Sequence, residues 1–253
     1  MGGLVTGDLG HSIRFDRPVS ELVGQAAPVT MTLALCAFLM VVAAAIPLGV
    51  LSARRPGGAL DTVIHVATET VLAIPPFFMA IILMLIFCTG QSLTSQGAAG
   101  TLGIPRMILP AAAIALSRMT MATAFLRDAL VEQSHSDYVR TARGKGASPA
   151  RVIWRHMFRN SLVPALTAAG LILAEVVGGS VIIEQVFMVP GLGRLLVTAV
   201  EARDFPLTEG IILLIAALVI LVNFLVDLCN QFIDPRLRLE VRPFRRNIRR
   251  GAS

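Results

Sequence analysis

Acidic and amide residues inside apolar segments are the first candidates for chemistry in this sequence. Glu69 and Glu175 each lie within a long apolar stretch, where an ionised side chain costs about 2.5 kcal/mol or more unless it faces a cavity or a partner. Both are therefore candidates for a pathway across a membrane. The alternatives are that Glu69 lies near the inner interface, about two helical turns from Asp61, and that Glu175 contacts a partner chain. Asn223 and Asp227, four residues apart, are expected to hold neighbouring helices by hydrogen bonds.

Catalytic sequence patterns do not occur. There is no His-Glu-x-x-His, Gly-x-Ser-x-Gly or phosphate-binding Gly-x-x-x-x-Gly-Lys-Ser/Thr pattern, so neither a hydrolase nor a self-contained ATPase is predicted. The histidines never stand three or four residues apart, and the three cysteines lie far apart in apolar stretches. We predict no enzymatic activity, no metal site, and thiols that are buried.

The composition predicts a membrane protein. Of the 253 residues, 55% are hydrophobic and 15% charged, and the mean hydropathy is +0.74, whereas roughly 25% of a soluble domain is charged. The net charge of +6 comes from basic residues that lie between or after apolar runs. We therefore predict a lipid bilayer as the surroundings and no nucleic-acid partner.

Apolar segments of about 20 residues, the length that crosses a bilayer, predict an all-α polytopic protein with about five transmembrane helices. The predicted spans are 26–51, 63–89, 105–121, 162–183 and 207–233. Arg106 and Arg118, near the ends of the short third span, are expected to reach the headgroups, and Pro75-Pro76 is expected to kink the second. The chain divides into an extracytoplasmic segment 1–25, a membrane domain 26–233 and a basic cytoplasmic tail 234–253.

Basic residues predict the orientation, because cytoplasmic loops carry an excess of Lys and Arg. One side would hold Arg54, Arg55, seven basic residues from Arg127 to Arg159 and seven arginines from Arg236 to Arg250, and the other side only Arg14, Arg17, Arg194 and Arg203. We expect the first side, with the C-terminus, in the cytoplasm and the loop 91–103 outside. With five spans the N-terminus is also outside, and since it has no signal sequence, a preceding helix is expected to be missing.

The longest predicted cytoplasmic loop reads as helix, glycine break, helix. Gly146 suits a helix C-terminus, while Ser148 can cap a second helix that has Pro149 at its first position. A short, arginine-rich surface helix ended by glycine is shaped to insert into a groove of a partner. The alternative is a solvated basic surface on the inner leaflet.

A resemblance to a known family rests on this loop. Residues 137–146 read Asp-Tyr-Val-Arg-Thr-Ala-Arg-Gly-Lys-Gly, and Arg-His-Met-Phe-Arg-Asn follows at 155–160. This run resembles the cytoplasmic signature loop of ATP-binding-cassette importer permeases, in the version of the dipeptide and oligopeptide branch. The Glu-Ala-Ala of the general pattern is Arg140-Thr141-Ala142 here, so the leading acid is absent. Other parts of that branch are resembled by segment 7–14 with Pro18-Val19, by segment 184–195, and by Asn223 with Asp227 followed by segment 234–236.

The resemblance implies a type I importer permease fold with six helices, of which this chain lacks the first. It implies a multi-pass subunit of a bacterial cytoplasmic membrane that moves dipeptides, oligopeptides or similar small solutes. The implied partners are a homologous second permease, two ATPase subunits that bind ATP and Mg, and an extracytoplasmic solute-binding protein. No cofactor is expected on this chain. A channel or a structural membrane subunit is the alternative function, but it leaves the loop around Gly146 unexplained.

The resemblance also assigns site residues. Those implied for coupling to the ATPase are Tyr138, Arg140, Thr141, Ala142, Arg143, Lys145 and Gly146. Those implied for an external gate or binding-protein contact are Pro190, Gly191, Gly193 and Arg194, for which an ordinary loop is the alternative. Glu69 and Glu175 remain the pathway candidates. The sequence leaves the solute open among dipeptides, oligopeptides, glutathione and metal chelates.

Overall fold

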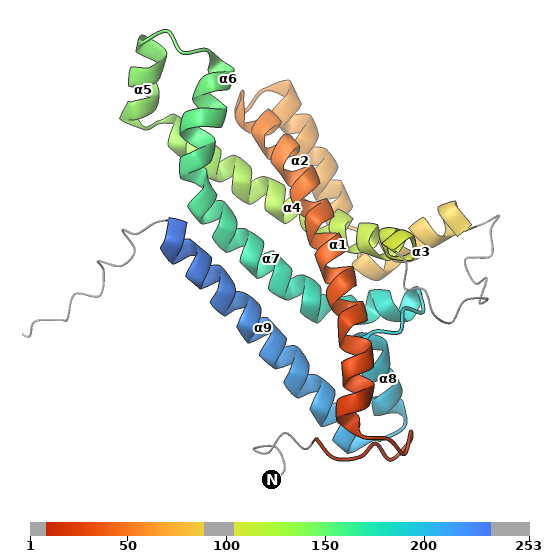
Figure 1. The fold of residues 1–253 in the computed structure, drawn as a ribbon. Helices are drawn as coiled ribbons and strands as arrows, with labels where there is room; N and C mark the ends of the chain where they lie inside the picture. Colours follow the sequence, from red (N-terminus) through yellow and green to blue (C-terminus); the bar gives the residue numbers. More distant parts are fainter. Residues whose placement is uncertain (1–8, 89–103, 234–253) are drawn as a thin grey trace, which may run out of the picture.

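The computed structural model describes residues 9–88 and 104–233, which form an elongated assembly of helices (Figure 1). Before the first helix, His11 and Pro18 form one isolated β-bridge. The helices, in chain order, are α1 (Val19–Ala53), α2 (Ala59–Leu72), α3 (Pro76–Cys88), α4 (Ile104–Ser134), α5 (Asp137–Gly144), α6 (Pro149–Arg151), the π-helical turn η2 (Val152–Met157), α7 (Phe158–Val186), α8 (Leu192–Glu201) and α9 (Phe205–Ile233). The predicted all-α fold is confirmed.

Four of these helices, α1, α4, α7 and α9, are long and apolar enough to cross a membrane, and the bent pair α2 and α3 makes up to five. The predicted number of about five is thus confirmed. The third predicted span, 105–121, is too short, because α4 continues to Ser134. Arg118 consequently lies near the middle of α4 and not near a helix end as predicted, while its contact with the headgroups stays a prediction.

The predicted kink at Pro75-Pro76 is confirmed and is sharp. α2 ends at Leu72, α3 begins at Pro76, and the two helices differ in direction by 96°. Proline has no backbone N–H and fixes its φ angle, so it ends one helix and is well tolerated at the first position of the next.

The central core lies where α1 packs along α4 and α4 along α7. Leu33 of α1, Ala111 of α4 and Ile172 of α7 are almost completely buried there. α9 runs beside α7 (Figure 1), but it is much less covered, since Phe224 is 61% exposed. Cys229 of α9 is also exposed, so the expectation of buried thiols is wrong for this residue.

The assembly has two ends that differ in content. The loop end consists of the α1–α2 turn (54–58) and the segment 135–157, and the clamp end consists of residues 9–18 and 184–204; they lie at opposite ends of the molecule (Figure 1). Arg54 and Arg55 therefore share the loop end with the arginines of α5 and η2. The predicted external loop 91–103, the tail 234–253 and the first part of segment 1–25 lie outside the described residues.

Candidate functional site

The loop end is seated on an apolar floor. Val139 of α5 is completely buried, and Val152 and Met157 of η2 are nearly so. They pack with Leu130 of α4 and Val50 of α1 in one cluster. Burial of these side chains removes apolar surface from water, so α5 and η2 are held against α1 and α4 with their polar faces outward.

The turn after α5 is a Schellman motif. Gly146 has φ of +79°. The N–H of Gly146 donates to the carbonyl of Arg143 at 2.9 Å, and the N–H of Ala147 donates to that of Ala142 at 3.1 Å, the two bonds that define the motif. The predicted helix stop at Gly146 is confirmed. Ser148 precedes Pro149 at the next helix start as predicted, but its side chain makes no capping hydrogen bond.

Five of the seven residues implied for ATPase coupling line a surface hollow of about 540 Å³, whereas Arg140 and Arg143 do not. Most of their side chains are exposed, whereas Tyr138 and Ala142 are half-buried, and the Tyr138 hydroxyl donates to Gln133 Oε1 at 2.7 Å. The hollow is lined by Tyr138, Thr141, Ala142, Lys145, Gly146, Ala147, Arg151 and His156. The sequence reasoning missed Arg151 and His156, which come from the second half of the loop and complete a basic lining.

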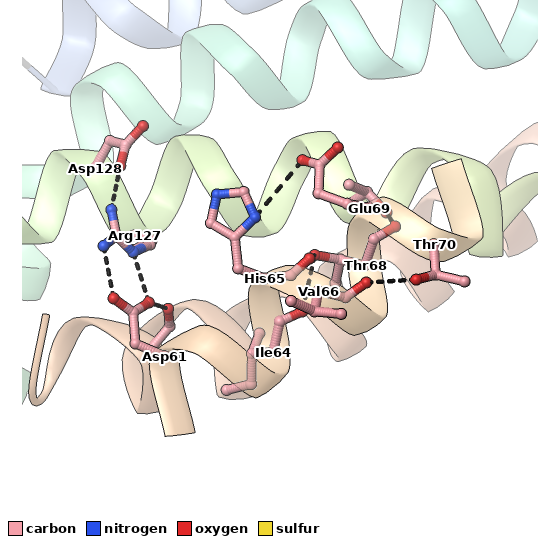
Figure 2. Close-up of polar contacts among 11 residues, drawn as sticks. Asp61, Ile64, His65, Val66, Thr68, Glu69, Thr70, Arg127 and Asp128 are labelled. Atoms are coloured by element: carbon pink, nitrogen blue, oxygen red, sulfur yellow. Dashed lines mark hydrogen bonds and ion pairs between the residues drawn. The ribbon is translucent and has the colours of Figure 1, made fainter. Parts of the chain in front are cut away.

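A buried ion pair lies between α2 and α4 (Figure 2). Arg127 donates to both carboxylate oxygens of Asp61, from Nε at 2.8 Å and from Nη2 at 2.7 Å. Asp61 also accepts hydrogen bonds from the Ser52 hydroxyl of α1 and from the Gly57 N–H at 2.7 Å, and Arg127 has a second partner in Asp128. The pair ties α1, α2 and α4 together beneath the loop end.

The two pathway candidates lie on different helices and have separate partners. Glu69 of α2 has a side chain that is 53% exposed, and its carboxylate lies 3.8 Å from His65 Nδ1 (Figure 2). Glu175 of α7 accepts a hydrogen bond from Arg118 of α4 at 2.5 Å. The Arg118 partner was not predicted, because the sequence reasoning placed this arginine at the membrane surface.

Asn223 and Asp227 of α9 are exposed. Neither is among the described hydrogen bonds between helices, so the predicted role of this pair is not supported by the structure. Asn230, two turns beyond Asn223, instead donates to Thr167 Oγ1 of α7 at 2.9 Å. This bond joins α7 and α9, as was expected of the other two residues.

At the clamp end, a fully buried carboxylate holds the hairpin between α7 and α8. Glu184 Oε2 accepts the N–H groups of Gly193 at 2.8 Å and Arg194 at 3.2 Å. Glu184 Oε1 accepts the hydroxyls of Thr30 at 2.8 Å and Ser180 at 3.1 Å. The carboxylate therefore caps the N-terminus of α8, where free N–H groups and the helix dipole favour negative charge, and it links this helix to α1.

Gly191 and Gly193 make room for this carboxylate. Both are buried. A Cβ atom on Gly191 would lie 2.4 Å from Glu184 Oε2, and one on Gly193 would lie 2.4 Å from the Cα of Val181. Two of the residues implied for an external contact thus lie inside the hairpin, pressed against Glu184 and the α7 backbone.

The other two implied external residues are at the surface. Pro190 is exposed, and Arg194 is half-buried with its Nη1 donating to the carbonyl of Met188 at 2.7 Å. The sequence reasoning missed Glu184 and Thr30 as the residues that hold this hairpin. The signal in the sequence was an acid at the end of an apolar span, followed by the Pro-Gly-x-Gly run.

A second buried carboxylate fastens the segment before α1. Asp204 is fully buried and accepts the Ser12 hydroxyl at 2.5 Å and the Arg14 N–H at 3.1 Å. Burial raises the pKa of the Asp204 carboxyl, but hydrogen bonds from Ser12 and from the N–H groups of Arg14, Ile13 and Leu207 outweigh burial and hold the pKa below its ordinary value. The clamp end is thus built around two carboxylates.

Known proteins resemble this chain over most of its length. The family model described as binding-protein-dependent transport system inner membrane component matches residues 45–239. The oligopeptide transport system permease protein AppB of Bacillus subtilis is 36% identical over 246 residues, which are 94% of this chain and 78% of that protein. The dipeptide transport system permease protein DppB of Bacillus subtilis is 34% identical over 238 residues, 93% of this chain and 76% of that protein.

A structural likeness agrees with these matches. A chain of the MetNI methionine ABC transporter, solved in inward-facing conformations, superposes with a TM-score of 0.71 and covers 84% of this chain and 96% of its own length. The sequence identity is 18%, so the likeness concerns the fold alone.

Proposed function

Since the chain belongs to the family of binding-protein-dependent transport system inner membrane components, we propose that it is a permease subunit of an ATP-driven importer of dipeptides or oligopeptides. It has the fold of type I ABC importer permeases, and relatives named as oligopeptide and dipeptide permeases match over more than nine-tenths of its length. The proposed location is a bacterial cytoplasmic membrane, with the loop end and the C-terminus in the cytoplasm.

The observation that carries the proposal is the exposed two-helix unit at the loop end. α5 and η2 present basic side chains and a hollow outward, while Val139 and Met157 seat the unit on α1 and α4. An acidic surface of an ATPase subunit fits this hollow by charge. The chain runs directly from α4 into the unit and from it into α7, so movement of the ATPase would be passed to both helices, the kind of rigid-body change that alternating access needs.

The remaining partners are proposed from the other surfaces. The exposed faces of α7 and α9 offer contacts to a homologous second permease and to lipid. At the clamp end, Pro190 and Arg194 are at the surface and are proposed to contact the solute-binding protein, while Gly191 and Gly193 keep the hairpin in place.

The proposed orientation is tested by thiol labelling. Cysteines introduced as Ala150→Cys and Ala202→Cys, in a variant without native cysteines, should react with an impermeant thiol reagent from opposite sides of the membrane. Labelling of both from one side would overturn the proposed orientation.

The coupling role is tested with Gly146→Glu in the assembled importer. We expect this variant to insert normally but to lose copurification of the ATPase subunits and ATP-dependent peptide uptake, because a side chain is strained at φ of +79° and would project where the ATPase docks. Gly144→Glu is the matched control, since Gly144 is also exposed and has open space where a Cβ atom would lie, but it belongs to α5. Lys145→Ala should have a smaller effect than Gly146→Glu.

Two results would contradict the proposal. Normal copurification and uptake with Gly146→Glu would make the loop a simple connector. Peptide flux that continues without ATP or without the ATPase subunits would favour the alternative of a channel.

A further inference from the structure

An ion pair lies near the middle of two candidate membrane spans. Arg118 Nη1 of α4 and Glu175 Oε2 of α7 are 2.5 Å apart, and the two side chains are 32% and 43% exposed. Glu175 is the central residue of the candidate span 164–186, and Arg118 is close to the centre of the candidate span 107–134. Neither side chain is near a helix end from which it would reach the headgroups.

The pair stands on an uncovered face of α7. Leu171, Glu175, Gly178, Gly179 and Ile182 recur every three or four residues and share one stripe along the helix, and Leu171 and Ile182 at its two ends are 51% and 55% exposed. A Cβ on Gly178 would meet no atom, and one on Gly179 would lie 3.5 Å from Arg118 Nη2. Gly178 therefore has open space beside it, and Gly179 lies against the guanidinium, each about one turn from the carboxylate.

Two charges at this depth require a polar surrounding. Ionisable groups inside a bilayer face a bundle interior or a water-filled cavity, and they pair with one another or with a charged ligand. A paired Arg and Glu that are both partly exposed present a positive and a negative group side by side. A solute with one ammonium and one carboxylate can pair with both, so that no charge is left without a partner when the solute enters or leaves.

We propose that Arg118 and Glu175 form a binding subsite for the charged termini of a peptide within the translocation pathway. Glu175 binds the α-ammonium and Arg118 binds the α-carboxylate, and the space beside Gly178 receives the peptide backbone. Two extended residues span about 7 Å at most, so a dipeptide can contact both groups, whereas the far end of a longer peptide extends beyond them. This inference rests on the proposed function of peptide import.

The test is photo-crosslinking in the assembled complex of both permeases and the ATPase subunits, without the binding protein. The probe is a dipeptide of alanine and benzoylphenylalanine with free termini, alongside its N-acetylated and C-amidated forms. We expect the free dipeptide to label α4 or α7 near the pair. Glu175→Gln should lower this labelling about tenfold, the equivalent of one lost charged hydrogen bond. N-acetylation should lower it similarly in the wild type and have no further effect in Glu175→Gln.

Arg118→Gln should also lower the labelling about tenfold. C-amidation of the probe should lower labelling in the wild type but have no further effect in Arg118→Gln, whereas N-acetylation should still lower it in this variant. Asp227→Asn is the matched control, because Asp227 is another exposed carboxylate within a candidate span, and its labelling should equal that of the wild type. Absence of labelling near the pair, or labelling that is indifferent to the termini, would overturn the subsite. Loss of the second permease from purified Glu175→Gln would also overturn it, in favour of a contact between permeases.

Failure of the subsite and failure of the proposed function give different results. If wild-type complex with binding protein and ATP imports no peptide into vesicles, the proposed function fails. If it imports peptide and Glu175→Gln does so equally well, only the subsite fails.

Discussion

The loop end and the clamp end are held together by opposite means. At the loop end, Val139 and Met157 are buried and most polar residues point outward. At the clamp end, Glu184 and Asp204 are buried and accept hydrogen bonds from backbone N–H groups and hydroxyls. An apolar floor tolerates small shifts, whereas a buried carboxylate requires each donor at its place. The difference suggests that the loop end is built to move with a partner and the clamp end to keep one shape.

The strongest test of this contrast is Glu184→Leu. It leaves the N–H groups of Gly193 and Arg194 and the Thr30 hydroxyl without their buried acceptor. We expect a loss of folding stability on the order of 3 kcal/mol, measured as thermal unfolding of the purified complex in detergent. Glu184→Gln should lose much less stability, because its amide oxygen can still accept both N–H groups. Its amide N–H groups can donate to the hydroxyl oxygens once those hydroxyls have rotated. Equal losses in the two variants would mean that packing, rather than hydrogen bonding, holds the hairpin.

Asp61→Asn tests whether the ion pair beneath the loop end is a rigid element. Asp61 accepts two hydrogen bonds from Arg127 and is almost completely buried, so its neutralisation should cost roughly 2 kcal/mol. Asp128→Asn is the control, because Asp128 is the exposed second partner of the same arginine, and its effect on the unfolding midpoint should be close to zero. If the two variants behave alike, the ion pair does not secure α2 to α4.

Sequence reasoning worked better for the loop end than for the clamp end. The helix stop at Gly146 and the start at Pro149 follow from neighbouring residues, because glycine favours positive φ and proline fixes its own φ. Glu184 was not recognised, because its partners include Thr30, 154 residues away, and no local pattern contains both. The ion pair of Arg118 with Glu175 was missed because Arg118 was placed at the membrane surface and its partner lies on another helix, 57 residues away.

Gly146→Ala measures how much of the stability of the loop end depends on the backbone turn alone. Gly146 and Gly144 are both exposed, and each has open space where a Cβ atom would lie, but only Gly146 has positive φ. Gly146→Ala should therefore cost about 1 kcal/mol, and Gly144→Ala, at the last residue of α5, should be neutral or stabilising. The readout is the unfolding midpoint together with affinity for the proposed ATPase subunits. A larger loss of affinity than of stability would indicate that the turn positions the proposed docking surface.

The smallest expected effect is the acid dependence of the second clamp carboxylate. The pKa of Asp204 is below its ordinary value in the folded protein, so its contribution to stability is complete above the unfolded pKa of about 3.9 and is lost as the pH falls through the lower folded value. Asp204→Asn should remove that part of the acid dependence, while its oxygen still accepts the Arg14 N–H near neutral pH. The difference in unfolding midpoint between wild type and variant should therefore be constant from neutral pH down to about 4 and shrink below it. A difference that grows on acidification would mean that Asp204 is protonated in the folded protein, and that the clamp end does not depend on a carboxylate at this position.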